Sequence, residues 1–277
     1  MLRFAWLVAL ATFGAALCPA QARIQDVIYE KSGGAAFTMD VFLPEKPNKA
    51  AVVWMVSGGW FSNHEGINQD LAKLFTSNGF TVFEVVHGAQ PRYKIPEIVE
   101  QVRKAVRFIR SRSNEYGIEP NRIGVAGASA GGHLSLMIGA SGDANAVAAI
   151  FPPTDFQNYG AAGRMPFDNP MMAPFIPAFG VDVKGPKEKI EETARATSPI
   201  AYVTAKYPPT LMVHGDKDVL VPMQQSQDMG RALDKAGVKN KVVIIPGGGH
   251  DDKTTMPALP EILAWFRTHL VAGGRPG

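Results

Sequence analysis

Short apolar runs rich in β-branched and aromatic residues alternate along the chain with segments of helical period. Helical spacing predicts helices at about 66–78, 95–114, 130–141, 222–236 and 257–270. Eight apolar runs have the length and composition of strands, and they span residues 24–30, 37–44, 51–57, 81–87, 122–128, 146–152, 209–215 and 241–247. Because helices connect most successive strands, the pattern predicts an α/β fold whose mostly parallel sheet has helices on both faces.

Two features modify this alternation. The sequence KSGGAA separates the first two runs by a hairpin-sized link, which predicts an antiparallel pair at the start of the sheet. Residues 152–201 are rich in Pro, Gly, Met and Phe and have no sustained period, which is typical of a functional lid or binding loop. A surface insertion packed on its own apolar residues is the alternative. Within this cap segment, we expect Met171 and Phe175 to contact substrate, and Asp155 to bind backbone at its root, with a catalytic role as the alternative for Asp155.

The first 22 residues have a different pattern. A short positive start, MLR, precedes an apolar stretch and the sequence Ala20-Gln21-Ala22, which together predict a signal peptide cleaved after Ala22. We therefore expect a secreted or periplasmic protein whose single catalytic domain spans residues 23–277. Leu17 precedes the only cysteine, Cys18, where lipoprotein signals have a small residue, so no stable membrane anchor is expected. The mature chain would then have no cysteine nucleophile, disulfide or thiolate metal site.

Composition adds little beyond an ordinary globular domain. The chain is 46% hydrophobic and 19% charged, with a formal net charge of +3. Basic residues between Arg103 and Arg112 lie opposite the apolar positions of a predicted helix, which indicates a solvated face. No nucleic-acid partner is expected.

The first chemical motif is GASAGG, residues 127–132, which follows one predicted strand and precedes a helix. A nucleophile elbow needs glycine two residues before and after its serine, because the turn brings the strand and helix into close contact. Gly127 and Gly131 stand at those positions around Ser129. By itself the motif is also consistent with a flexible turn of small residues.

Two later loops supply the partners that a catalytic serine requires. HGDKD, residues 214–218, follows one predicted strand, and GGGHD, residues 247–251, follows the next. We therefore expect Ser129 as nucleophile, His250 as its general base and Asp218 as the carboxylate that orients the imidazole. Asp216 is the main alternative acid and Asp251 a weaker one, and Asp218 has the alternative role of a helix N-cap.

Together these motifs resemble the α/β-hydrolase superfamily, and within it the carboxylesterase and lipase-like group that includes feruloyl-esterase-like and hormone-sensitive-lipase-like proteins. The resemblance covers nearly all of the mature chain and includes FPPTD, HGDKDVLVP, PGGGHDD and IPEIVEQVRKAVRFIR. It implies an eight-stranded sheet with a short cap segment, no cofactor and no metal. It also implies that Asp218, rather than Asp216, is the triad acid.

One motif departs from the group's pattern. Where such proteins have His-Gly-Gly-Gly-Trp, this chain has Val56-Ser57-Gly58-Gly59-Trp60. The loop presents a backbone N–H to the oxyanion and the residue after the nucleophile presents another. We therefore expect an oxyanion hole formed by Ala130 with Gly59 or Trp60, and Ser57 in place of the bracing histidine.

Aromatic residues near this loop complete the predicted site. Trp60 and Phe61, with His87 after a neighbouring strand, would suit stacking on a sugar or an aryl acyl group, and ordinary packing is the alternative. The sequence thus predicts an exported serine carboxylic ester hydrolase acting on acylated carbohydrates, aryl esters, lipids or polyesters. A serine peptidase of similar fold and a non-catalytic binding protein are the alternatives.

Overall fold

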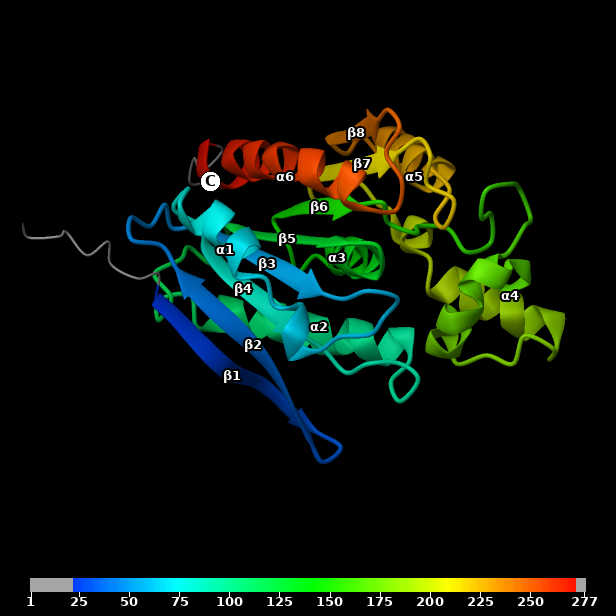
Figure 1. Ribbon diagram of the computed structural model, residues 1–277, viewed down its shortest axis with the longest axis horizontal. Coiled ribbons are helices and arrows are strands. Elements are labelled where there is room, and N and C mark those ends of the chain that lie inside the picture. Colours follow the sequence, from blue (N-terminus) through cyan, green and yellow to red (C-terminus); the bar gives the residue numbers. More distant parts are fainter. Residues whose placement is uncertain (1–21, 273–277) are drawn as a thin grey trace, which may run out of the picture.

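All eight predicted strands form one sheet in the computed structural model, which describes residues 22–272 (Figure 1). The sheet order is β1-β2-β4-β3-β5-β6-β7-β8, with β1 and β2 antiparallel to their neighbours and the rest parallel. The strands are β1 Ala22–Ser32, β2 Ala35–Leu43, β3 Ala51–Val56, β4 Thr81–Val86, β5 Ile123–Ala128, β6 Ala146–Ile150, β7 Thr210–Gly215 and β8 Asn240–Ile245. The mostly parallel α/β sheet and its antiparallel start are therefore confirmed.

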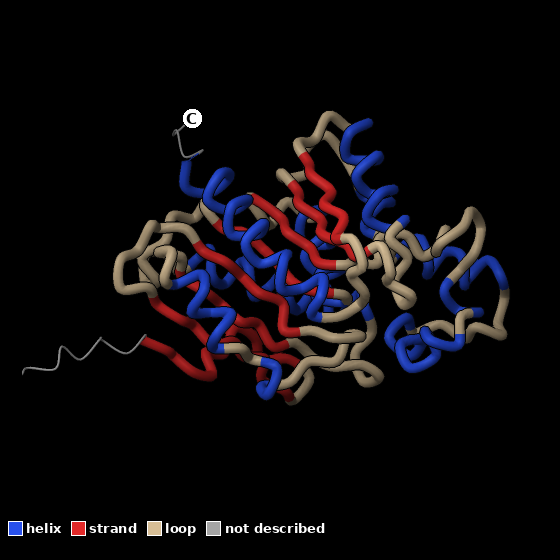
Figure 2. Tube along the Cα trace, turned by 45° about the horizontal axis from the view of Figure 1, so that its top comes forward, coloured by secondary structure: helices blue, strands red, loops and turns tan. Residues whose placement is uncertain are grey.

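Helices cover both faces of the sheet, as the pattern predicts (Figure 2). Apolar side chains of α2, α3 and α5 share one core with the sheet, and those of α1 and α6 share the other. The α-helices are α1 Gln69–Thr76, α2 Ile95–Ser111, α3 Ala130–Ala140, α4 Lys187–Ala196, α5 Gln224–Lys235 and α6 Asp252–Phe266. Helix α6 begins five residues earlier than predicted, because the Asp251 side chain accepts a hydrogen bond from the Lys253 amide.

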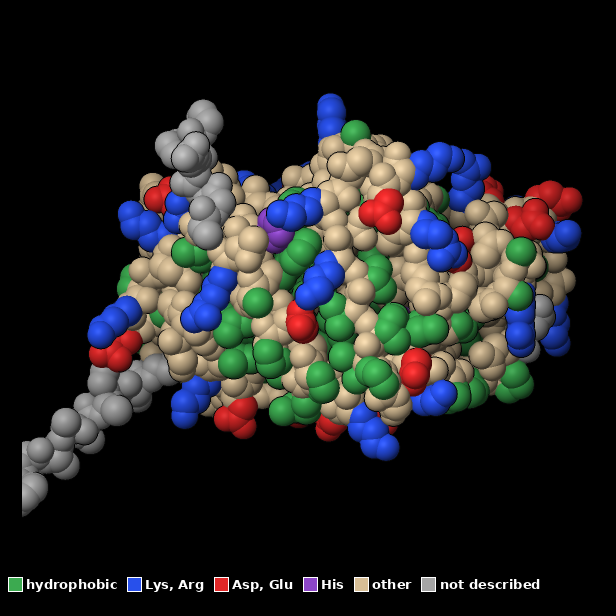
Figure 3. Space-filling view, turned by 90° about the horizontal axis from the view of Figure 1, so that it is seen from above, with side chains coloured by type: hydrophobic (Ala, Val, Ile, Leu, Met, Phe, Trp, Pro, Cys, Tyr) green, Lys and Arg blue, Asp and Glu red, His purple; other side chains and the backbone are tan. Residues whose placement is uncertain are grey.

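The predicted signal segment, residues 1–22, lies outside the described residues except for Ala22. Within residues 22–272, no helix combines the length and the apolar character needed to span a bilayer. Two of the basic side chains of α2 are paired rather than free, since Arg103 and Arg107 each bind a carboxylate oxygen of Asp143. On the face seen from above in Figure 3, both signs of charge are scattered around a band of hydrophobic side chains.

The cap segment, residues 152–201, contains more regular structure than its sequence indicates. It includes the short helices η2 Pro166–Asp168, η3 Pro170–Phe179 and η4 Pro199–Tyr202, together with α4. Helix α4 was not predicted, although its buried Ile190 and Ala194 are four residues apart. Gln225 of α5 binds the backbone of Thr154 and Asp155 at the root of the cap segment. As expected, the Asp155 carboxylate accepts local backbone amides, those of Gln157 and Asn158.

Two acidic side chains are buried side by side in the sheet. Asp40 of β2 and Glu84 of β4 are register partners, and both are almost fully buried. Arg23 pairs with Asp40 at 2.5 Å, whereas Glu84 accepts one hydrogen bond, from the Asn68 amide at 2.6 Å. Burial raises the pKa of Glu84 to about 8, and the neighbouring Asp40 carboxylate adds to the increase. Glu84 is therefore protonated in the folded protein at neutral pH.

This arrangement predicts how stability depends on pH. The pKa of Glu84 is higher in the folded state than its ordinary value of 4.5. Its contribution to the free energy of unfolding is therefore complete below pH 4.5 and is lost as pH rises through about 8. We expect the unfolding free energy, measured by urea denaturation, to fall across this range in the wild type and to fall less steeply in Glu84→Gln. Glu119→Gln, at a half-exposed surface pair, is the control and should keep the wild-type slope. Equal slopes in Glu84→Gln and wild type would contradict the assignment.

Candidate active site

The turn between β5 and α3 holds Ser129 in a backbone conformation that few non-glycine residues adopt, with φ at 53°. Its neighbours explain the two glycines of the motif. A Cβ on Gly127 would lie 2.5 Å from the carbonyl carbon of Gly131, and one on Gly131 would lie 2.8 Å from the carbonyl oxygen of Met55. No side chain fits at either position, so the turn has the close packing that a nucleophile elbow requires.

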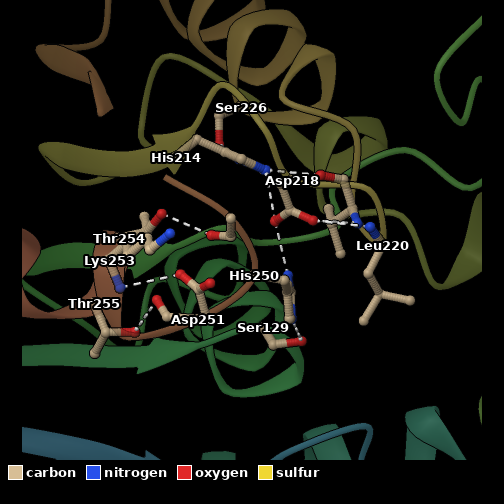
Figure 4. A network of polar contacts seen from close by, with 12 residues as sticks. Ser129, His214, Asp218, Leu220, Ser226, His250, Asp251, Lys253, Thr254 and Thr255 are labelled. Atoms are coloured by element: carbon tan, nitrogen blue, oxygen red, sulfur yellow. Dashed lines mark hydrogen bonds and ion pairs between the residues drawn. The ribbon is translucent and has the colours of Figure 1, made fainter. Parts of the chain in front are cut away.

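Three loops at the carboxyl ends of the strands bring Ser129, His250 and Asp218 together (Figure 4). The Nε2 atom of His250 lies 2.9 Å from Ser129 Oγ, and its Nδ1 atom lies 2.8 Å from Asp218 Oδ2. The ring of Phe151, at the end of β6, packs on the imidazole with 4.2 Å between ring centroids. This geometry allows Nδ1–H to donate to the carboxylate while Nε2 accepts the serine proton.

The Asp218 carboxylate is fully buried and has partners on both oxygens. Oδ1 accepts the backbone amides of Leu220 and Val221, and Oδ2 lies 3.4 Å from His214 Nε2 in addition to His250. Burial by itself raises the pKa of Asp218, but the hydrogen bonds from His214 and His250 outweigh it and hold the pKa below its ordinary value. The carboxylate is therefore ionised next to the imidazole that must accept a proton.

The alternative acids have other partners. Asp216 is exposed and accepts the amide of Gly247, which ties the loop after β7 to the loop after β8. Asp251 caps α6 and does not contact the imidazole of His250 in Figure 4. Only Asp218 among these three carboxylates binds His250 within the described chain.

The predicted oxyanion loop is a two-residue turn. Gly58 and Phe61 exchange both backbone hydrogen bonds, at 3.0 and 2.9 Å, and the two central residues, Gly59 and Trp60, both have positive φ. Among residues 22–272, neither central amide has a protein acceptor. Gly59, Trp60, Ser129 and Ala130 border one cavity, so the turn and the first residue of α3 lie beside the serine.

A histidine supports this turn, but it stands at another position in the chain than the histidine of the His-Gly-Gly-Gly-Trp motif. His87, directly after β4, is buried, and its Nε2 atom lies 2.8 Å from Ser57 Oγ. Its Nδ1 atom lies 2.9 Å from the carbonyl of Gly88, and burial lowers the pKa of His87 to about 4. Nδ1 therefore carries the proton, and Nε2 accepts the Ser57 hydroxyl. His87 thus packs as a brace rather than as a surface for substrate.

The structure corrects part of the predicted substrate wall. Phe175 does border the cavity beside Ser129, but Met172 takes the place predicted for Met171, which is 48% exposed. Trp60 also borders this cavity, but its indole is only 2% exposed and donates to His133 Nδ1, so most of the ring packs in the core. Phe61 borders a second hollow, which Ser57 and Gly58 also border.

Sequence reasoning missed several residues of the cavity and its support. Tyr159 and Leu220 contribute to the cavity wall, and the Tyr159 hydroxyl donates to the Leu220 carbonyl at 2.9 Å. Gln90, which is 3% exposed, binds the oxyanion turn from behind. Of these residues, only Leu220 has a position in the sequence that indicates a place near the site, because it follows Asp218 by two residues.

The family model described as BD-FAE matches residues 39–233, which is well over half of the chain. The chain belongs to the BD-FAE family. The matched region includes the elbow and Asp218 and ends before His250. The predicted resemblance to the carboxylesterase-like α/β hydrolases is thereby confirmed.

The chain is also similar to a curated esterase and to two solved esterase structures. Esterase LipC of Mycobacterium tuberculosis is 28% identical over 220 residues, which are 75% of this chain and 54% of LipC, so the chain spans about half of that relative. A truncated carbohydrate esterase from gut microbiota has a TM-score of 0.76 at 24% identity, over 90% of this chain and 96% of that one. Butyrate-bound esterase Est2 of Thermogutta terrifontis has a TM-score of 0.71 at 22% identity, over 92% and 95%. These structures establish the α/β-hydrolase fold.

The different contacts of Asp218 and Asp216 predict that their substitution will affect the reactivity of Ser129 differently in this BD-FAE family member. Asp218→Asn cannot stabilise a protonated His250, so we expect labelling of Ser129 by a fluorophosphonate to slow by about 10⁴-fold. Asp216→Asn, the matched control two residues away, should stay within about threefold of wild type. The second-order rate constant of labelling measures both, and a larger effect at Asp216 would reverse the assignment.

Proposed function

We propose that this protein is a serine carboxylic ester hydrolase that works through an acyl-enzyme. The observation that carries the proposal is the continuous contact from Asp218 through His250 to Ser129, beside a turn whose two central amides have no protein acceptor among residues 22–272. Family membership and the esterase names of its relatives support the same class of reaction.

The geometry gives each group a role. Ser129 Oγ attacks the ester carbonyl while His250 Nε2 takes its proton, and Asp218 stabilises the resulting imidazolium. The carbonyl oxygen gains negative charge and receives hydrogen bonds from Ala130 and from the turn at Gly59 and Trp60. His250 then protonates the leaving alcohol, whose departure forms the acyl-enzyme. Water, activated by the same imidazole, attacks the acyl carbonyl and releases the acid.

The cavity beside Ser129 favours short acyl groups. Its volume is about 20 Å³, and apolar side chains of the cap segment form much of its wall, with contributions from Pro153, Tyr159, Met172, Phe175 and Leu220. Binding pockets for drug-sized ligands measure roughly 300–1,000 Å³, so this cavity suits an acetyl to butyryl chain better than a long lipid chain.

The second hollow, which Phe61 borders, suits the alcohol portion of the ester. It is larger and is bordered by the polar residues Ser57, Ser62 and Asn63 beside the exposed ring of Phe61. Such a mixture of polar groups and an aromatic face suits a hydroxyl-rich alcohol such as a sugar. We therefore propose short-chain acylated carbohydrates as the substrate class, and, from the predicted signal peptide, action outside the cytoplasm.

The first test concerns the reaction itself. Purified protein should hydrolyse p-nitrophenyl acetate and butyrate, and Ser129→Ala should lower kcat by at least about 10⁴-fold, because it removes the nucleophile. A feruloyl ester and an aminoacyl p-nitroanilide serve as the comparison substrates for aryl esters and peptides. Ester turnover that survives in Ser129→Ala would exclude Ser129 as the nucleophile.

The second test concerns acyl length. Phe175→Ala should enlarge the cavity and raise kcat/KM for octanoate relative to acetate by roughly tenfold, because a longer chain then fits. Met171→Ala changes an exposed neighbour in the same helix and should leave this ratio unchanged. An unchanged ratio in Phe175→Ala would show that the acyl chain lies elsewhere.

A further inference from the structure

We infer that Gln90 is a positioning residue for the oxyanion hole, through which the cap segment holds the turn at Gly59 and Trp60. The inference deepens the proposed function and rests on it. Gln90 follows β4, is 3% exposed, and binds both central residues of the turn. Its backbone amide donates to the Trp60 carbonyl at 3.0 Å, and its Nε2 donates to the Gly59 carbonyl at 3.2 Å.

The peptide geometry makes these contacts relevant to the reaction. In a trans peptide the C=O of one residue and the N–H of the next point in opposite directions. Holding the Gly59 carbonyl from behind therefore fixes the direction of the Trp60 N–H. The Gly58 carbonyl, which accepts the Phe61 amide at 2.9 Å, fixes the Gly59 N–H in the same way. One donor of the turn is thus oriented within the turn, whereas the other depends on Gln90.

The second hydrogen of the Gln90 amide connects the turn to the cap segment. Nε2 also donates to the carbonyl of Pro174 in η3, at 3.0 Å. In a 3₁₀ helix this carbonyl would accept the N–H three residues later, but that residue is Pro177, which has none. Gln90 satisfies the acceptor that the proline leaves open. The Phe175 ring of the same helix also packs against the turn, because it occupies the space that a side chain on Gly59 would need.

The side chain of Gln90 is therefore suited to this place for a specific reason. An amide NH₂ offers two donors to two carbonyls, and neither a carboxylate nor an apolar side chain of the same length can do so. Without these bonds, the Gly59–Trp60 peptide would be free to rotate, and its N–H would stabilise the developing oxyanion less well. The expected loss is in kcat, since the contact does not reach the bound substrate.

Two variants test the inference with p-nitrophenyl acetate. Gln90→Met removes both donors at similar length and should lower kcat by about 10- to 100-fold, with KM within threefold of wild type; loss of a whole oxyanion donor sets the upper bound of about 10³. Gln90→Glu places a carboxylate against two carbonyls at alkaline pH and regains one O–H donor when protonated. Its kcat relative to wild type should therefore rise as pH falls from 9 to 6.

The control is Gln101→Met. Gln101 is also buried and accepts the amide of Gly88 in the same segment, but it does not bind the turn. It should lose a similar amount of thermal stability while keeping kcat within about threefold. Wild-type kcat in Gln90→Met, or a pH-independent ratio in Gln90→Glu, would overturn the inference. Absence of ester turnover in the wild type, or its persistence in Ser129→Ala, would instead refute the proposed function.

Discussion

The close approach of helix α3 to the sheet is the constraint on which the site depends. Gly127 and Gly131 are in contact, and Gly131 also lies against the Met55 carbonyl of β3. The chain can pass this point only through a turn that forces Ser129 to positive φ and places its hydroxyl beyond the strand ends. The same contact brings Ala130, at the first turn of α3, next to the loop that continues from β3. Nucleophile and oxyanion donors are thus positioned by backbone packing.

Histidines support this arrangement in ways that differ from the role of His250. His87, His133 and His214 are buried, and both ring nitrogens of each have a partner. Burial lowers the pKa of His87 and His133 to about 4, so these rings stay neutral and act as rigid connectors between loops. His133, for example, accepts the Trp60 indole N–H and binds the Thr197 carbonyl at the end of the cap segment. His250 differs from these three because 18% of its side chain is exposed at the site.

The sequence predicted those parts of the site in which a reactive residue lies in the loop that follows an apolar strand. Ser129 comes directly after β5, Asp218 three residues after β7 and His250 five residues after β8, so the parallel sheet brings them to one edge. The cap segment was less predictable, because its 3₁₀ turns follow a period of three and several prolines interrupt it. For this reason the sequence predicted Met171 at the cavity wall where the structure has Met172. Neighbouring residues of this helix face opposite environments. Gln90 could not be found, because its partners are main-chain carbonyls 31 and 84 positions away.

The way the cap segment attaches has a consequence for how its specificity can change. Its contacts with the segment after β4 are made by the carbonyls of Pro174 and Pro177, which bind Gln90 and Lys94. Main-chain acceptors persist when neighbouring side chains are exchanged. Residues such as Met172 can therefore vary in size while the cap segment stays docked, so the acyl cavity can diverge among related proteins separately from the machinery that it covers.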